Sequence, residues 1–433
     1  MSAAPTAEIR LNLRLLPILV GALLLLQLVW PFGGWRLLLA GLGGTWLVAY
    51  LWARSLAHSL RLVREMRFGW AQVGDTLEER FTLINHSWLP ALWVEIVDHS
   101  TLPGYTASRG IGASGKQENR WQTRGTCSRR GIFMLGPTTL RCGDPFGIYT
   151  VCLRDPASAT LTVMPPVVPL PSIEVAPGSY AGDGHPRPAT YDRTVNTGGI
   201  REYRPGDSPR WIHWPSSAHH GSLMVRLFDG APVSDWWIML DLHADVQAGQ
   251  GQSSTEEHGV ILAASLADRG LRLGRSVGMI AYGKELAWLP AQPGDLQRLR
   301  ILRALAQISA GRHPLADLIE RARPALGRGP SLVIITPDTS GRWVTALLAL
   351  LRGNAVPTVL LLEPSSFGGS GNMQATAALL AKQGIPHSII TRELLDRPEM
   401  RPGQQGTWKW RTLASGRVIP IQQPGDTGWR PLR

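Results

Sequence analysis

The sequence contains few cysteines and few charged residues. Three cysteines are scattered at irregular spacing over 433 residues, which is too few for a disulfide framework or a four-ligand zinc site. Unpaired thiols suit a reducing compartment. Only 18% of the residues are charged and 44% are hydrophobic, and this balance excludes an intrinsically disordered chain. The length predicts two or three domains.

Lysine is also scarce, so the basic charge is carried by arginine. The net charge is +12, yet only four of the 44 basic residues are lysines. Such a charge first suggests nucleic acid. However, residues 1–70 hold seven arginines and two glutamates, whereas residues 231–395 hold fifteen basic and thirteen acidic residues. We therefore expect contact with membrane lipid and no nucleic-acid partner. Non-specific binding of nucleic acid or anionic lipid is kept as a third hypothesis.

Recognisable catalytic motifs are missing. The sequence has no glycine-rich phosphate loop, nucleophile elbow or His-Glu-x-x-His pattern, so it predicts no enzyme and no catalytic residue. A Ser/His/Asp triad can be imagined, because His213, His219 and His220 lie near Ser216, Ser217 and Asp207, but proximity in sequence is weak support for one.

Two long apolar runs dominate residues 1–70. They cover residues 15–30 and 37–53, and each approaches the ~20 residues that span a bilayer. A cleaved signal peptide is the alternative, but the second run follows the first at once. Basic residues flank both outer ends of the pair and only Arg36 lies between the runs. The sequence thus predicts a two-helix transmembrane hairpin in the inner (plasma) membrane, with both termini in the cytoplasm.

Residues 71–165 read as an all-β, sandwich-like module. Short β-type runs at 81–84, 93–97 and 159–164 are separated by turn formers. Within the module, Asp-Pro-Phe-Gly at 144–147 is expected to be a turn with a buried aromatic ring. Residues 166–230 follow as a proline- and glycine-rich linker that leads into a signature loop.

The signature loop, residues 198–226, is dense in chemically distinctive residues. Asp207 after Pro205-Gly206 suits a helix N-cap, so we expect a short helical turn at 210–214. The arginines around Asp207 could form ion pairs that hold the loop against a neighbouring domain, or they could bind an anion. Nearby acidic residues favour the structural interpretation; an anion-dependent enzyme or hydrolase is the second hypothesis. The positions assigned to structure or partner binding are Arg201, Tyr203, Arg204, Gly206, Asp207, Arg210, Trp214 and Ser217.

Residues 231–395 alternate strand and helix patterns. A buried-type strand at 236–240 begins the series, which predicts a C-terminal α/β domain with a mainly parallel, doubly wound sheet. Asp241 and Asp338 follow two of the strands, at the edge where such sheets place their sites. Residues 396–433 form a basic tail with a possible β-hairpin.

The order of these motifs resembles the bacterial domain-of-unknown-function 58 family. The resemblance is carried by R-G-x-x-x-L-G-P at 130–137, D-P-F-G at 144–147, R-x-Y-x-P-G-D-x-x-R-x-I-x-W at 201–214 and S-A at 217–218. It implies a von Willebrand factor A-like domain, a MoxR-type AAA+ ATPase as partner, and no established catalysis. We therefore expect a membrane-anchored, cytoplasm-facing interaction or scaffold protein that serves the assembly or maturation of envelope or other complexes.

Von Willebrand A domains carry a metal-binding D-x-S-x-S motif with a later threonine and aspartate. Here Asp241 is kept, but His243 and Asp245 stand where the serines belong, and residues 310–314 lack the threonine. Asp241 and Asp338 thus form a degenerate site, and we expect no resident cofactor. Mg²⁺ or Mn²⁺ is the ion that the remaining oxygens would suit. Alternatively, both aspartates are strand-end carboxylates paired with local N–H groups or with arginines.

Overall fold

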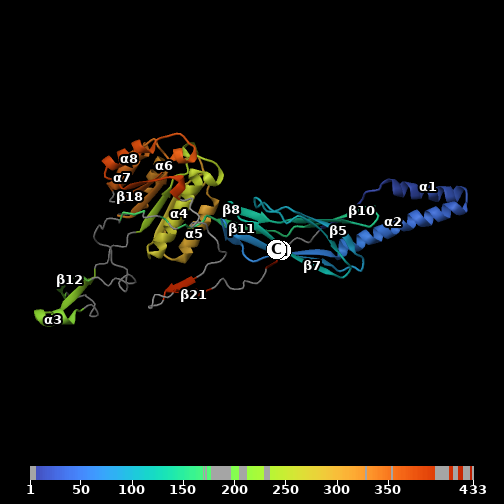
Figure 1. Cartoon of the computed structure of the whole chain (residues 1–433), viewed down its shortest axis with the longest axis horizontal. Helices are drawn as coiled ribbons and strands as arrows, with labels where there is room; N and C mark the ends of the chain where they lie inside the picture. The colour runs from blue at the N-terminus through green and yellow to red at the C-terminus, as the bar shows by residue number, and fades with distance from the viewer. Residues whose placement is uncertain are drawn as a thin grey trace. The chain divides into compact units, whose positions relative to one another are not determined.

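The computed structural model describes residues 6–168, 170, 173–176, 197–203, 212–228, 235–326, 329–352, 355–394, and the backbone of 409–412, 418–422 and 430–431. It divides into two compact units, one of residues 1–166 with 401–433 and one of residues 167–400 (Figure 1). The first unit contains the N-terminal helices together with the β module, which the sequence suggested as separate domains.

Packing along the second N-terminal helix explains why these parts form one unit. The first helix, α1, covers Leu15–Val29, and α2 covers Gly33–Ser59. Only α2 is both long and apolar enough to cross a membrane, because α1 has 15 residues. The C-terminal half of α2 is buried in the core of the β module through Ala49, Ala53 and Leu56. The helix then continues directly into the first strand of a sheet.

The β module is mainly antiparallel, with alternating buried and partly exposed residues along its strands. The exception is a parallel pairing of β3 with β11. The first sheet has the order β1 (Thr6–Leu11), β10 (Tyr149–Asp155), β9 (Thr138–Gly143), β5 (Ala91–Asp98) and β6 (Arg109–Ala113). The second has the order β22 (Arg430–Pro431), β2 (Leu60–Met66), β4 (Thr76–Asn85) and β7 (Glu118–Thr126). The third has the order β3 (Trp70–Gln72), β11 (Ala159–Met164) and β8 (Gly131–Leu135).

The Asp-Pro-Phe-Gly turn between β9 and β10 differs from its prediction. Its buried member is Asp144, whose carboxylate accepts hydrogen bonds from the N–H groups of Phe146 and Tyr149. Phe146 is 56% exposed. The prediction of a buried aromatic ring was wrong because the carboxylate braces the turn from inside and leaves the ring facing outward.

A buried ion cluster ties β2 to its neighbours. Arg64 forms a bidentate pair with Glu79 at 2.8 and 2.7 Å and a third bond with Asp98 at 2.7 Å. Tyr105 donates its hydroxyl to Glu79. Although burial opposes its charge, Arg64 has a raised pKa because these carboxylates hold the guanidinium ionised. Because the two carboxylates balance the charge of Arg64 inside the core, Arg64 is not one of the basic residues that face the membrane.

The second unit contains a six-stranded sheet that is parallel except for one edge strand. Helices cover both faces of this sheet, which confirms the prediction of a doubly wound sheet. The strand order is β16 (Leu286–Gln292), β15 (Val277–Tyr282), β14 (Trp236–Leu240), β17 (Ser331–Thr336), β18 (Val356–Leu362) and β19 (His387–Ile390), with β16 antiparallel. The helices are α4 (Thr255–Arg272), α5 (Asp295–Gln307), α6 (Leu315–Ala322), α7 (Trp343–Leu351) and α8 (Met373–Lys382).

Alternate residues of β14 face the two helical layers. Trp237 and Met239 share a core with α6, α7 and α8. On the other face, α4 packs against β14 and β17, and a Cβ at Gly259 would lie 2.9 Å from Leu240, so the glycine allows a close approach. Ser254 caps α4 by accepting a hydrogen bond from Glu257 N–H at 3.3 Å. Short 3-10 helices connect these elements: η3 (Ala244–Val246), η4 (Gly251–Ser253), η5 (Pro364–Phe367) and η6 (Arg392–Leu394).

The signature loop contributes a small structure of its own to the second unit. Strand β12 (Thr197–Glu202) pairs antiparallel with β13 (Met224–Phe228), and helix α3 (Trp214–His220) lies between them in sequence. The helix begins at Trp214 with Pro215 in its first turn, whereas the sequence suggested a helical turn at 210–214. In the tail, β20 (Lys409–Thr412) and β21 (Val418–Gln422) pair antiparallel, where a hairpin was predicted.

Candidate functional site

Asp241 lies at the carboxyl edge of the α/β sheet and is only 3% exposed. Its two carboxylate oxygens accept different hydrogen bonds: one from the Thr336 hydroxyl at 2.6 Å and one from the His243 N–H at 3.0 Å. These donors come from the ends of two adjacent parallel strands, β14 and β17. The carboxylate therefore ties the two strand ends together.

Burial is the main influence on the charge of Asp241. It raises the pKa of Asp241 to about 6, and the nearby Asp338 adds to this effect, while the bonds from Thr336 and His243 oppose it. A bound cation or a proton would stabilise a carboxyl group that is buried in this way.

Asp338 is brought to the same edge, as the sequence predicted. Thr336 connects the two aspartates because its hydroxyl also accepts the Asp338 N–H at 3.0 Å. Asp338 in turn accepts the Ser340 N–H at 2.7 Å. The sequence reasoning missed Thr336, although a polar residue at the end of an apolar strand was the available signal. Both aspartates accept local N–H groups, as the alternative interpretation held.

The other candidate metal ligands do not gather around this pair. His243 has its Nε2 3.5 Å from the exposed Asp245, and His313 stacks on Tyr282 with ring centroids 3.6 Å apart. Among the residues that the structure describes, no group of three or more His, Cys, Asp or Glu side chains is placed to hold a metal ion.

The loop at 310–314 lies beside Asp241 through its backbone. Gly311 N–H donates to Leu242 O at 2.8 Å, and Gly311 O accepts from Ala244 N–H at 2.7 Å. A Cβ at Gly311 would lie 2.1 Å from Gly283 backbone atoms, so this close approach requires glycine. The loop where the threonine was sought thus supports the edge by backbone contacts.

In the signature loop, Ser217 joins α3 to β13. Its hydroxyl accepts the Met224 N–H at 2.8 Å and donates to His213 O at 3.0 Å. The backbone adds a bond from His213 N–H to Met224 O at 2.8 Å and one from Tyr203 N–H to Leu223 O at 2.7 Å. Ser217 and Tyr203 therefore act in the packing of the loop.

Three apolar side chains of the signature loop are left exposed: Trp214 at 67%, Leu223 at 44% and Ile200 at 41%. Arg201, on β12, donates to Glu202 O at 3.0 Å. Arg204, Gly206, Asp207 and Arg210 lie outside the described residues. We refer to Ile200, Trp214 and Leu223 as the exposed apolar residues of the signature loop.

One imidazole–hydroxyl contact occurs in the same loop. His213 Nδ1 lies 2.6 Å from Ser216 Oγ. The two residues are three positions apart at the start of α3, so the contact follows from local helix geometry. The aspartate of the imagined triad, Asp207, lies outside the described residues.

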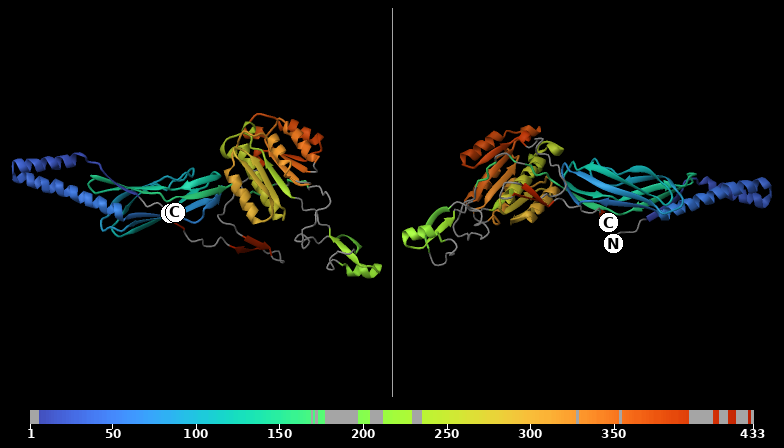
Figure 2. Two further views of the ribbon diagram at one scale, coloured as in Figure 1. Left: turned by 180° about the vertical axis from the view of Figure 1, so that it is seen from behind. Right: turned by 60° about the horizontal axis from the view of Figure 1, so that its bottom comes forward.

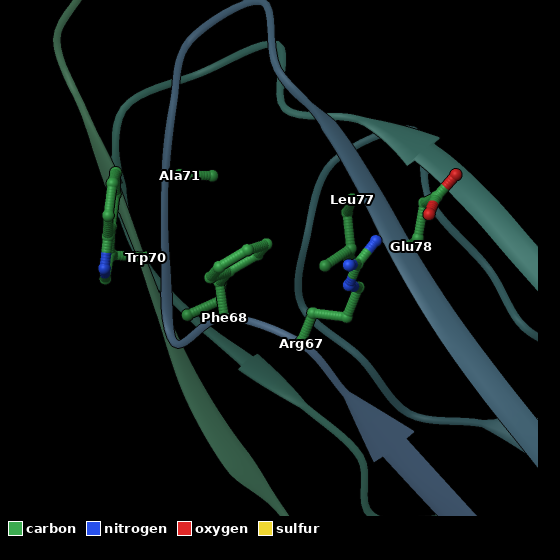
Figure 3. Close-up of a pocket in the computed structure, with 7 residues that line it drawn as sticks. Arg67, Phe68, Trp70, Ala71, Leu77 and Glu78 are labelled. Carbon is green, nitrogen blue, oxygen red and sulfur yellow. The ribbon is translucent and has the colours of Figure 1, made fainter. Parts of the chain in front are cut away.

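The described part of the β module has hollows of its own. Figure 3 shows Arg67 and Phe68 beside Leu77 and Glu78 in a hollow that has no room for a water molecule. Another hollow is an open groove of about 550 Å³. Its lining includes Thr6, His99, Thr139, Arg141 and Arg154. Arg141 lies 3.7 Å from Glu95, so part of the positive charge on this surface is balanced.

Two uncharacterized bacterial proteins are similar to about two fifths of the chain. The uncharacterized protein YeaD of Bacillus subtilis is 29% identical over 170 residues, which cover 38% of this chain and 39% of YeaD. The uncharacterized protein Rv1480 of Mycobacterium tuberculosis is 28% identical over 175 residues, which cover 39% of this chain and 55% of Rv1480. The chain thus matches between two fifths and just over half of the length of these relatives.

Solved structures show weaker similarity. The SpRpn10 VWA domain is 10% identical, with 39% of this chain and 98% of that domain covered and a TM-score of 0.27. The CARDB domain of PF1109 from Pyrococcus furiosus is 10% identical, with 24% and 90% covered and a TM-score of 0.19. Such TM-scores do not assign a fold, so the fold rests on the strand order. The family model described as "Protein of unknown function DUF58" matches residues 199–365, and this segment therefore belongs to the domain-of-unknown-function 58 family, as its motifs indicated.

Proposed function

We propose that the chain is a membrane-anchored, cytoplasm-facing interaction protein that recruits a protein partner through its signature loop and α/β unit. The observation that carries this proposal is the exposure of three apolar side chains of the signature loop, Ile200, Trp214 and Leu223. Exposed tryptophan on an ordered scaffold is typical of the residues that dominate binding energy at protein interfaces. The Ser217 bonds hold α3 on β13 and so fix the helix on which Trp214 lies.

The proposed anchor is the helical pair α1 and α2. The 27-residue α2 is apolar, and only 11% of its most apolar stretch is buried, which is unlike the core helix of a soluble protein. Leu28 and Leu37 near the tip of the pair are about four fifths exposed. The exposed Arg14, Arg54 and Arg61 flank the outer ends, so the positive-inside rule supports a cytoplasmic location for both termini.

The resemblance to the domain-of-unknown-function 58 family supplies the class of partner, a MoxR-type AAA+ ATPase. In this proposal the protein holds the ATPase at the membrane during assembly or maturation of envelope or other complexes. It assigns the chain no catalytic step and no resident cofactor. The degenerate Asp241 edge acts in the proposal as a support for the strand ends of the α/β sheet.

Affinity capture from detergent-solubilised membranes tests this proposal. The full chain is compared with Trp214→Ala and with Leu273→Ala, a control that removes another exposed apolar side chain, which is 65% exposed on the same unit. We expect an AAA+ ATPase to be retained by the unsubstituted chain and by Leu273→Ala, and to be lost from Trp214→Ala. The proposal fails if no ATPase is retained with either ATP or ADP present.

A further inference from the structure

The helical pair is short for a membrane-crossing element. At 1.5 Å per residue, the 15 residues of α1 rise about 22 Å. The part of α2 that is free of core packing is similar, because from Ala49 onward one face of the helix, with Ala49, Ala53 and Leu56, packs in the core of the β module. This leaves about 24 Å from its start at Gly33. The hydrocarbon core of a bilayer is about 30 Å thick. The end of the β module must therefore approach the membrane closely if the pair crosses it.

That end of the β module exposes large apolar side chains. Trp88 is 81% exposed, Leu92 58%, Trp93 47% and Phe146 56%. Trp88 lies in the loop before β5, Leu92 and Trp93 lie on the first residues of β5, and Phe146 lies on the turn between β9 and β10. Figures 1 and 2 show β5 and β10 at the end of the module from which α1 and α2 extend, with β8 and β11 at the opposite end.

Hydrogen bonds fix these loops at the base of the helices. Trp52 of α2 donates its indole N–H to Pro90 O at 3.1 Å. Asn12, just before α1, donates its backbone N–H to Ile148 O at 2.8 Å and its side-chain amide to Gly147 O at 3.3 Å. The exposed rings are therefore held beside the point where the apolar helices leave the module.

The chemistry of this end suits a lipid interface. Tryptophan and basic residues are the side chains that favour the headgroup region. Here the Lys116 ammonium lies 3.3 Å from the ring centroid of Trp88, and the exposed Arg14 and Arg54 lie on the adjoining ends of the helical region. This end of the β module is continuous with the apolar surface of α1 and α2, so we take lipid as the partner that covers it. Any other partner would have to compete with the bilayer for the same surface.

We propose that segment 86–93 and the Asp144–Ile148 turn insert their aromatic side chains into the interfacial layer of the cytoplasmic leaflet. The β module then rests on the membrane, and an insertion of about 5–10 Å offsets the short length of the helical pair. This inference depends on the proposed membrane anchor, and it assigns a lipid-contacting role to the Asp-Pro-Phe-Gly motif.

Fluorescence quenching by lipid tests the inference on the full chain. In a Cys152→Ser background, single cysteines replace Trp88, Phe146, Leu25 of α1 or Ile132 of β8 and are labelled with an environment-sensitive dye. All four side chains are exposed, at 81%, 56%, 66% and 50%, so their replacement leaves the core intact. The chains are reconstituted into phosphatidylglycerol–phosphatidylcholine vesicles that carry a shallow doxyl quencher.

We expect loss of fluorescence at positions 25, 88 and 146 and no loss at position 132, which lies at the far end of the module. Quenching at 25 without quenching at 88 and 146 overturns the inference and leaves the anchor intact. Absence of quenching at 25 overturns the anchor, and the inference with it. A blue-shifted but unquenched dye at 88 and 146 also overturns the inference, because it indicates that protein covers this end.

Discussion

At the scale of single residues, the buried carboxylate of Asp241 lowers the stability of the folded state at neutral pH. Its folded-state pKa of about 6 lies above the ordinary value of 3.8, so the folded chain keeps the proton that the unfolded chain loses. Stability therefore falls as the pH rises from about 4 to about 6, and the loss is complete above that window.

We predict that Asp241→Asn raises the free energy of unfolding of the α/β unit at pH 8 by about 1–3 kcal/mol, because it removes the cost of burying the charge. Thermal unfolding of the solubilised full chain at pH 4 and pH 8 measures this effect, which should disappear at pH 4. If Mg²⁺ stabilises the unsubstituted chain and not Asp241→Asn, the degenerate site binds metal after all.

Ser217 offers a second test at this scale. Its hydroxyl both accepts from Met224 N–H and donates to His213 O, so Ser217→Ala should cost about 1–2 kcal/mol locally. We expect the Met224 amide to exchange its hydrogen roughly tenfold faster. Ser222→Ala is the matched control, because the Ser222 hydroxyl reaches only the Met224 sulfur at 3.8 Å. Equal exchange rates in both variants would refute a structural role for Ser217.

At the scale of elements, the buried Arg64 cluster connects β2 with β4 through Glu79 and with the end of β5 through Asp98. Arg64→Met would leave Glu79 and Asp98 without their counterion, so we predict a loss of about 3–5 kcal/mol in the stability of the β module. Arg124→Met removes an exposed partner of Glu78 and should cost at most about 1 kcal/mol. Chemical denaturation in detergent compares the two. Similar losses of stability in both variants would show that burial of the cluster does not increase its contribution to stability.

Elements with a regular hydrophobic pattern could be predicted from the sequence. The strand at 236–240 has the expected bounds, because a short run of apolar residues suits a strand that is buried on both faces of a sheet. The start of α3 was harder to predict from the sequence. Pro209 and Pro215 both suit a first helical turn, and local sequence does not decide between them.

At the scale of the whole molecule, the features that could not be predicted from the sequence are those that depend on contacts between distant residues. Asp241 and Asp338 could be placed on one sheet edge because parallel strands share their carboxyl ends. The burial of Arg64 depends on a partner far away in the sequence, Asp98. The exposure of Phe146 depends on the burial of the Asp144 carboxylate inside the turn. The hydropathy of residues 1–70 likewise carries no sign that half of α2 belongs to the core of the β module.

The affinity of the captured ATPase for the purified full chain tests the central claim most directly. We predict that Trp214→Ala weakens this affinity by about 30-fold or more, the equivalent of the ~2 kcal/mol that marks a dominant interface residue, while Leu273→Ala binds like the unsubstituted chain. Equal affinities of all three chains, each shown to be folded, would contradict recruitment of a partner through the signature loop.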